Sequence, residues 1–289
     1  MAAGEQMAFV LKPHKSVTRQ LRRLVARELR DALAALADPA SAGTGVHEAR
    51  KSVKKIRAVV RVLHDELGSR GRDNQRLRQT AHRLSALRDA DATGETLQQL
   101  HGRYPGVITA KIVREIARGL EGRKRRVRAS KRRAIALATG ELGRLSKSLP
   151  DRVRKAGRFK TVRRGVTRGW RRATRAMKGL DQSSDATQFH EWRRRVKDHW
   201  YQMRLLAARH PTARSRAATL KKLERWLGDD HNLSMLRAAI LAAPDRFGDA
   251  RTIDIVLGCI VKYQAWLRKR SLRLGHRMFA RKAATFWDE

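Results

Sequence analysis

The chain has 289 residues, and its 67 lysines and arginines against 27 aspartates and glutamates give a formal net charge of +40 at pH 7. Its length suits two ordinary domains or one domain made of two similar halves, and its 41% hydrophobic content excludes a disordered chain. Such an excess of cations makes a compact protein repel itself, so we expect a polyanionic partner: DNA, RNA, an anionic membrane or an inorganic polyanion.

The composition also bears on where the protein resides. A single cysteine, Cys259, excludes an internal disulfide and suits a reducing compartment. The N-terminal segment MAAGEQMAFVLKPHKSV lacks the pattern of a signal peptide, and no apolar run approaches the roughly 18 residues of a membrane span. We therefore expect a cytoplasmic protein that does not enter the membrane.

The first half of the chain predicts helices. Prolines are few, and long segments rich in Ala, Leu, Arg, Lys and Glu indicate an all-α fold. After an N-terminal tail, residues 1–11, the first half comprises residues 12–150 and predicts four helices. Their expected ranges are 14–36, 46–67, 74–101 and 109–149, the last one broken near residues 119–122 or at residue 140.

After Pro150 the pattern restarts, and residues 151–289 predict four more helices. An apolar stripe with steps of three or four residues, from Phe159 to Met177, marks the first of them. The polar segment DQSSD then separates it from the next. The expected ranges are 159–177, 189–206, 212–242 and 249–281.

The two halves share a motif. VHEARKSVKKIRAVVRVL, residues 46–63, and FHEWRRRVKDHWYQMRLL, residues 189–206, keep His, Glu, Arg, Val, Lys, Arg and Leu at matching places. His190 follows His47 by 143 residues. The segments LSALRDAD, residues 84–91, and LGDDHNLS, residues 227–234, preserve the same offset. This register predicts an internal duplication.

Each histidine helix carries a row of cations beside an apolar stripe. In the first copy the row has steps of 3, 4, 3 and 4 residues, so its members share one face of the helix. Successive turns rise by about 5 Å, which suits a phosphate polymer, and arginine and lysine both bind phosphate oxygens. The alternative is a solvated basic face. The candidate residues are His47, Arg50, Lys51, Lys54, Arg57 and Arg61, and in the second copy His190, Arg193, Arg194, Lys197 and Arg204.

Acidic residues near these motifs offer weaker candidates. Glu48 and Glu191 follow the histidines, and a role at the helix N-terminus is favoured over acid–base chemistry. For two further clusters of acidic residues, helix capping or hydrogen bonding to neighbouring helices is favoured over metal binding. They are Asp89 with Asp91, and Asp229 with Asp230 and His231. No phosphate-binding Gly-rich loop, Gly-x-Ser-x-Gly, His-Glu-x-x-His or cysteine pair occurs, so we expect no catalytic residue, metal site or cofactor.

These motifs resemble those of the CHAD domain, a family named for its conserved histidines and α-helical content. The resemblance lies in two Val/Phe-His-Glu-x-Arg helices with a following lysine, each succeeded by Leu-x-x-x-x-Asp/Asn, and covers residues 12–287. It implies two four-helix bundles related by pseudo-twofold symmetry in one compact domain, with a basic central cavity or groove. It also implies that the protein binds inorganic polyphosphate through the residues of the two histidine helices. Our leading hypothesis is therefore a non-enzymatic polyphosphate-binding protein that associates with polyphosphate granules.

The sequence departs from the family pattern in places. Lys54 and Lys55 stand where paired arginines are common, and residues 198–200, Asp-His-Trp, stand where cations are expected. The second half is therefore expected to contribute less to the ligand. The Glu-x-Glu-x-Lys motif of the triphosphate-tunnel domains often fused to the family is absent, so no triphosphatase activity is carried over.

Two other functions compete with polyphosphate binding. The first is a nucleic-acid-binding or compacting protein, for which net charge suffices. Against it, aromatic residues make up 5% of the chain and no basic run is interleaved with them. The second is an enzyme that acts on polyphosphate, for which no catalytic constellation is visible.

Overall fold

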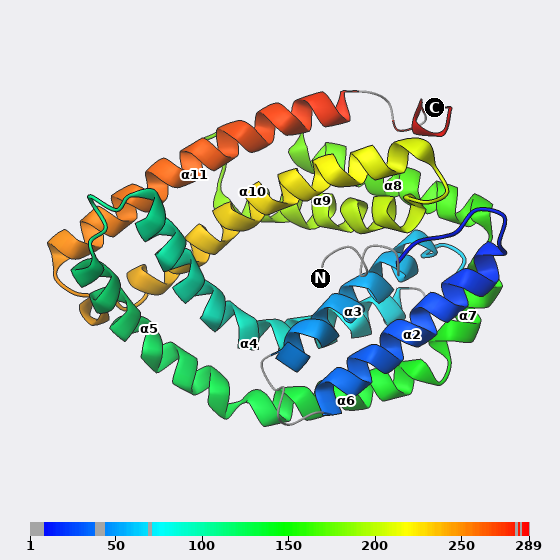
Figure 1. The fold of residues 1–289 in the computed structure, drawn as a ribbon, viewed down its shortest axis with the longest axis horizontal. Coiled ribbons are helices and arrows are strands. Elements are labelled where there is room, and N and C mark those ends of the chain that lie inside the picture. The colour runs from blue at the N-terminus through cyan, green and yellow to red at the C-terminus, as the bar shows by residue number, and fades with distance from the viewer. Residues whose placement is uncertain (1–8, 38–43, 69–70, 281–282, 284, 289) are drawn as a thin grey trace.

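The computed structural model describes residues 9–37, 44–68, 71–280, 283 and 285–288, without the side chains of residues 86–91 and 123–129. These residues form helices and no strand, which confirms the all-α fold (Figure 1). Residues 38–43, which separate the first two predicted helices, lie outside the described part. In chain order the helices are α2 (Val17–Ala37), α3 (Thr44–Val62), α4 (Arg72–Arg103), α5 (Ala110–Ala129), α6 (Lys131–Ser146), α7 (Leu149–Ala156), α8 (Phe159–Met177), α9 (Ala186–Leu206), α10 (Pro211–Leu241), η1 (Pro244–Arg246), α11 (Ala250–Phe279) and η2 (Thr285–Trp287).

The break predicted within residues 109–149 is at a different place. Neither Gly119 nor Gly140 ends a helix; α5 runs to Ala129 and α6 starts at Lys131. Gly119 serves packing instead, because a Cβ there would lie 2.5 Å from the carbonyl oxygen of Arg246. The glycine thus lets η1 approach α5 closely.

The expected boundaries differ at three further places. Helix α3 ends at Val62, before the expected Leu67, and Pro150 lies at the start of the separate helix α7, which packs against α2. Phe9 and Leu11, assigned to the N-terminal tail, are buried, and the Leu11 amide donates a hydrogen bond to the Leu205 carbonyl at 2.7 Å. The chain is therefore attached to the core before α2 begins.

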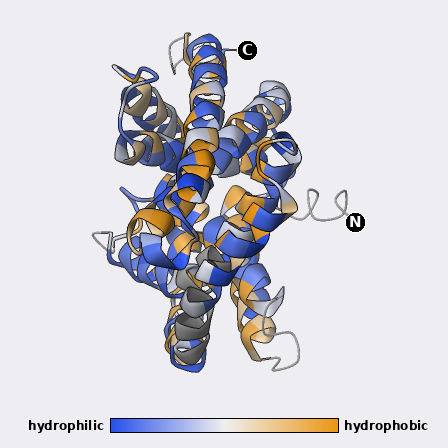
Figure 2. Cartoon of the chain, turned by 90° about the vertical axis from the view of Figure 1, so that its left-hand side faces the viewer, coloured by the Kyte–Doolittle hydropathy of each residue, from blue (hydrophilic) through white to orange (hydrophobic). Residues whose placement is uncertain are grey.

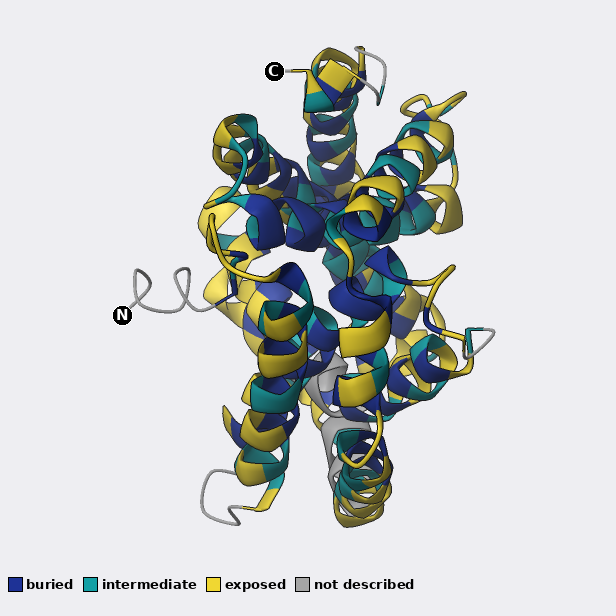
Figure 3. Cartoon of the chain, turned by 90° about the vertical axis from the view of Figure 1, so that its right-hand side faces the viewer, coloured by how far each residue is buried: buried dark blue, intermediate teal, exposed yellow. Residues whose placement is uncertain are grey.

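The buried side chains form two hydrophobic clusters. One lies among α2, α3, α6 to α9 and the nearby parts of α4 and α10. The other lies at the opposite end of the long axis, among α5, most of α11 and the remaining parts of α4 and α10 (Figure 1). Figure 2 shows the hydrophobic stripes along the helices, and Figure 3 shows exposed residues on their outward faces. Each cluster includes residues from both 12–150 and 151–289. The core thus joins the two halves into one domain.

Helix α8 approaches its neighbours through two glycines one turn apart. A Cβ at Gly165 would lie 2.0 Å from the carbonyl oxygen of Val62 in α3, and one at Gly169 would lie 2.0 Å from Oε1 of Gln202 in α9. Both distances are far shorter than van der Waals contact. The two glycines therefore set how closely α8 packs on the pair α3 and α9. None of the described helices has the length and apolar character that crossing a bilayer requires.

We predict that Gly165→Ala lowers the free energy of unfolding by about 1–3 kcal/mol, because the Val62 backbone must move to admit the methyl group. Gly140→Ala is the matched control, since Gly140 is exposed within α6 and a Cβ there meets no atom within 4 Å. The control should gain about 0.5–1 kcal/mol from helix propensity. Urea denaturation of both variants measures the difference, and equal shifts would contradict the packing argument.

Candidate functional site

All predicted site residues lie on α3 and α9, and the structure leaves every one of them half-buried. A solvated basic face would leave them exposed, so that alternative is not supported. Helix α3 buries Val53, Ile56 and Val60 in the core, which places its cations at the edge of the packed face. Helix α9 begins with a capping box, in which the Asp185 carboxylate accepts a hydrogen bond from the backbone N–H of Gln188 at 2.8 Å. The cap fixes the start of the second histidine helix.

Helices α3 and α9 are in contact, and their cation rows meet. Lys54 lies near Lys197, Arg50 and Arg193, whose charges add to the effect of burial and lower its pKa to about 7. Burial likewise lowers the pKa of Lys197. We call this group the α3–α9 cation site. Its members are Arg50, Lys54, Arg57, Arg61, Arg193, Arg194 and Lys197.

The central contacts of this site are reciprocal. Lys54 interacts with Arg193, and Lys197 interacts with Arg50. At the 143-residue offset, Arg50 corresponds to Arg193 and Lys54 corresponds to Lys197. The contact between Lys54 and Arg193 in one direction therefore corresponds to the contact between Lys197 and Arg50 in the other. A twofold axis between α3 and α9 would produce this reciprocity. The pseudo-twofold symmetry itself and the division at residue 150 stay predictions.

The C-terminal part of α3 continues the site. Burial, followed by the charges of neighbouring arginines, lowers the pKa of Arg57 and of Arg61. Both guanidinium groups nevertheless remain protonated at neutral pH, because their lowered pKa values, about 10 for Arg57 and about 9 for Arg61, still lie above 7. The buried Nε atoms of Arg57 and Arg193 have no hydrogen-bond acceptor within the described part of the chain. Helices α3 and α9 therefore each carry one buried N–H donor for which the described residues supply no acceptor.

Two carboxylates offset part of this charge. Glu224 of α10 forms ion pairs with Lys197 and, at 3.6 Å, with Arg193, and these cations lower its pKa against the effect of burial. Asp198 forms an ion pair with Arg61. Glu224 could not be predicted from the repeat, because the 143-residue offset pairs it with Ala81 in the first half. Cations still outnumber carboxylates in the site.

The second histidine pairs with another imidazole. His190 Nδ1 lies 3.1 Å from Nδ1 of His231 on α10, so one ring must donate and the other accept. Burial, and then the charge of Arg193, lowers the pKa of His231 to about 3, so this ring is neutral at pH 7. Asp230 of the 229–231 cluster accepts a hydrogen bond from Arg268 of the neighbouring helix α11 at 2.9 Å, as predicted, whereas the absence of a metal site there stays a prediction. Groups of three potential metal ligands do not occur among the described residues, and the side chains of Asp89 and Asp91 lie outside them.

Some predicted residues have other contacts. Lys51 forms an ion pair with Glu48 at 3.0 Å, and Arg194 forms one with Glu191 at 2.9 Å. The expected N-terminal roles of Glu48 and Glu191 are wrong, because neither lies in the first turn of its helix and both bind a cation three residues later. Arg204 lies 5.0 Å from the ring centroid of Trp200. This cation packs on an aromatic face.

The fold and the site define an all-helical protein with paired cationic helices. The chain belongs to the CHAD domain family, whose model matches residues 23–241. Its structure is similar to the CHAD domain from the plant Ricinus communis (TM-score 0.63, 16% identity, covering 95% of this chain and 96% of that one). It is also similar to PptA from Streptomyces chartreusis (TM-score 0.61, 16% identity, covering 95% and 100%). At this identity the likeness shows the fold. No curated protein matches the sequence significantly.

The lowered pKa of Lys54 predicts a pH-dependent stability. An unfolded lysine titrates near pH 10.4, so between about pH 7 and pH 10 the unfolded chain binds more protons than the folded one and stability rises with pH. Lys54→Met removes the buried charge and should stabilise the protein at pH 7 by up to a few kcal/mol, an advantage that shrinks toward pH 10. Denaturant unfolding at several pH values measures this difference. The exposed Lys111→Met is the control, and parallel curves for wild type and Lys54→Met would contradict the prediction.

Proposed function

We propose that the protein binds inorganic polyphosphate at the α3–α9 cation site and does not convert it. The observation that carries this proposal is the meeting of two rows of half-buried cations, with donors that lack acceptors among the described residues. Cations held together in this way repel one another. A polyanion that lies between them relieves the repulsion and supplies the missing acceptors. Membership of the CHAD family supports the same ligand. Residence in the cytoplasm, at polyphosphate granules, belongs to this proposal.

Nucleic acid is the second candidate, and one surface favours it. Arg103 of α4 lies 4.4 Å from the ring centroids of both Tyr263 and Trp266 of α11, and Arg270 lies 4.6 Å from that of Trp266. Cations and aromatic rings therefore alternate here, although no basic run in the sequence showed it. A base would have to displace an arginine in order to stack on these rings. Polyphosphate at the α3–α9 cation site requires no such displacement, which is why it is the leading proposal.

Removal of cations from the site should weaken binding specifically. The triple variant Arg50→Gln, Lys54→Gln, Arg57→Gln is expected to lose at least about tenfold in affinity for long-chain polyphosphate, because charge-assisted hydrogen bonds are lost. The control is Lys111→Gln, Arg114→Gln, Arg118→Gln, three exposed cations of α5. Titration at near-physiological salt, with RNA and duplex DNA as competitors, measures both. Equal losses, or preference for a nucleic acid of equal charge, would refute the proposed site.

Binding should also take up protons. At pH 8 most Lys54 is neutral in the free protein, since its pKa is about 7, and an adjacent phosphate raises that pKa again. Calorimetric titrations in two buffers of different ionisation enthalpy should show uptake of up to about one proton per site occupied. Lys54→Met should take up fewer protons than wild type, with the remainder going to Lys197, whose pKa is also lowered, and Lys111→Met should keep the wild-type uptake. Uptake that is the same in both variants would show that Lys54 does not contact the ligand.

A further inference from the structure

Helix α8 carries a row of arginines on the face opposite its buried stripe. The buried face includes Val162, Val166 and Trp170. The outward row repeats at intervals of about one turn, so its charges rise along the helix every ~5 Å. Its members are Arg164, Arg168, Arg171, Arg172 and Arg175; Arg168 is half-buried and the others are exposed.

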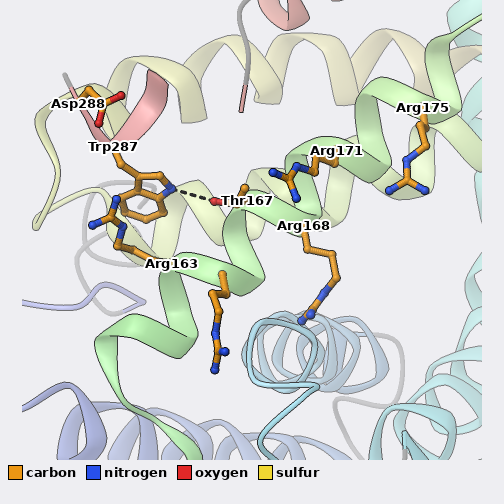
Figure 4. Close-up of a pocket in the computed structure, with 8 residues that line it drawn as sticks. Arg163, Thr167, Arg168, Arg171, Arg175, Trp287 and Asp288 are labelled. Atoms are coloured by element: carbon orange, nitrogen blue, oxygen red, sulfur yellow. Dashed lines mark hydrogen bonds between the residues drawn. The ribbon is translucent and has the colours of Figure 1, made fainter. Parts of the chain in front are cut away.

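A pocket of about 650 Å³ lies between this row and the C-terminal segment (Figure 4). Trp287 forms one wall, fixed by a 2.9 Å hydrogen bond from its Nε1 to Oγ1 of Thr167. The Arg163 guanidinium lies 5.1 Å from the Trp287 ring centroid. Five arginines line the pocket, and Asp288 alone carries a negative charge among the lining residues. The pocket is therefore a cationic recess with a rigid wall.

The row divides into two parts by its ion pairs. Arg164 pairs with Glu66, and Arg168 pairs with Asp65, both in the turn that follows α3. Arg171 and Arg175 form no ion pair with a carboxylate in the described part of the chain, and Arg172 interacts with the charge of Asp65 without pairing with it. The first part attaches α8 to α3, and the second part is available to a ligand.

The row is continuous with the α3–α9 cation site. Arg61, the last cation of that site on α3, lies near enough to Arg172 for their charges to interact. Arg168 Nη2 also donates to the Arg61 carbonyl at 3.2 Å, where Gly165 allows the close approach of the two helices. One track of cations thus runs from Lys54 and Lys197 past Arg61 onto α8.

We infer that Arg171, Arg172 and Arg175 form a second polyphosphate-binding segment, which extends the α3–α9 cation site along α8. This inference rests on the proposed function. A chain of a few phosphates occupies the α3–α9 cation site alone, whereas a long chain engages both segments. Affinity therefore increases with chain length through the second segment, because its contact becomes intramolecular once the first is made.

The test compares tripolyphosphate with long-chain polyphosphate. Arg171→Gln, Arg172→Gln, Arg175→Gln should weaken binding of the long chain about tenfold and leave tripolyphosphate binding within about twofold of wild type. The matched control Lys111→Gln, Arg114→Gln, Arg118→Gln removes the same charge from exposed positions of α5. It should weaken binding of both ligands slightly and equally. Thermal unfolding of each variant checks that the fold is kept.

The outcomes separate the two proposals. If wild type binds the long chain and the α8 variant loses no more than the α5 control, the second segment is refuted and the α3–α9 cation site stands. Equal losses for short and long chains would also refute it, because the arginines would then act on a single site. If wild type binds neither polyphosphate, the proposed function itself fails. As a second variant, Arg175→Glu alone should again weaken only the long chain.

Discussion

Repulsion among the half-buried cations of α3 and α9 is the constraint on which the rest of the structure depends. Removal from water and the proximity of like charges both oppose folding, as the lowered pKa of Lys54 records. Two features offset this cost. Apolar stripes on the same helices bury Val53 and Val196 in the core, and Glu224 and Asp198 neutralise part of the charge. The cations can therefore stay close together before a ligand binds, and a pre-formed binding site requires this.

Cations elsewhere in the protein have a structural role. Lys55 binds Glu28 at 3.1 Å, and Ser52 donates to the same buried carboxylate at 2.8 Å, which joins α3 to α2. Arg268 binds Asp230 and joins α11 to α10. Each of these cations has a buried carboxylate of its own, whereas Lys54, Arg193 and Lys197 of the site share the single carboxylate of Glu224. Net charge alone does not distinguish the structural cations from those of the α3–α9 cation site. The difference in their carboxylate partners decides which cations can bind a ligand.

The glycines of α8 connect packing with the proposed ligand. Without a Cβ at residue 165, α8 lies against the end of α3, and this contact places Arg168 and Arg172 beside Arg61. A wider separation would leave two isolated basic patches. The close approach makes one track of cations, and the proposed second segment uses this track to bind long polyanions more tightly than short ones. The recess beside Trp287 lies along the same track (Figure 4).

The sequence by itself determined the helices, the repeated histidine motif, the single face shared by each cation row and membership of the CHAD family, because helical periodicity and motif spacing are local properties. It located wrongly the break within residues 109–149, since Gly119 serves a contact with η1 that no local pattern reveals. Only the tertiary structure decided that Lys54 meets Lys197, that Glu224 and His231 face the site and that α8 continues it. The physical reason is that these contacts join helices distant in the chain, and their closeness depends on which small residues let two helices approach.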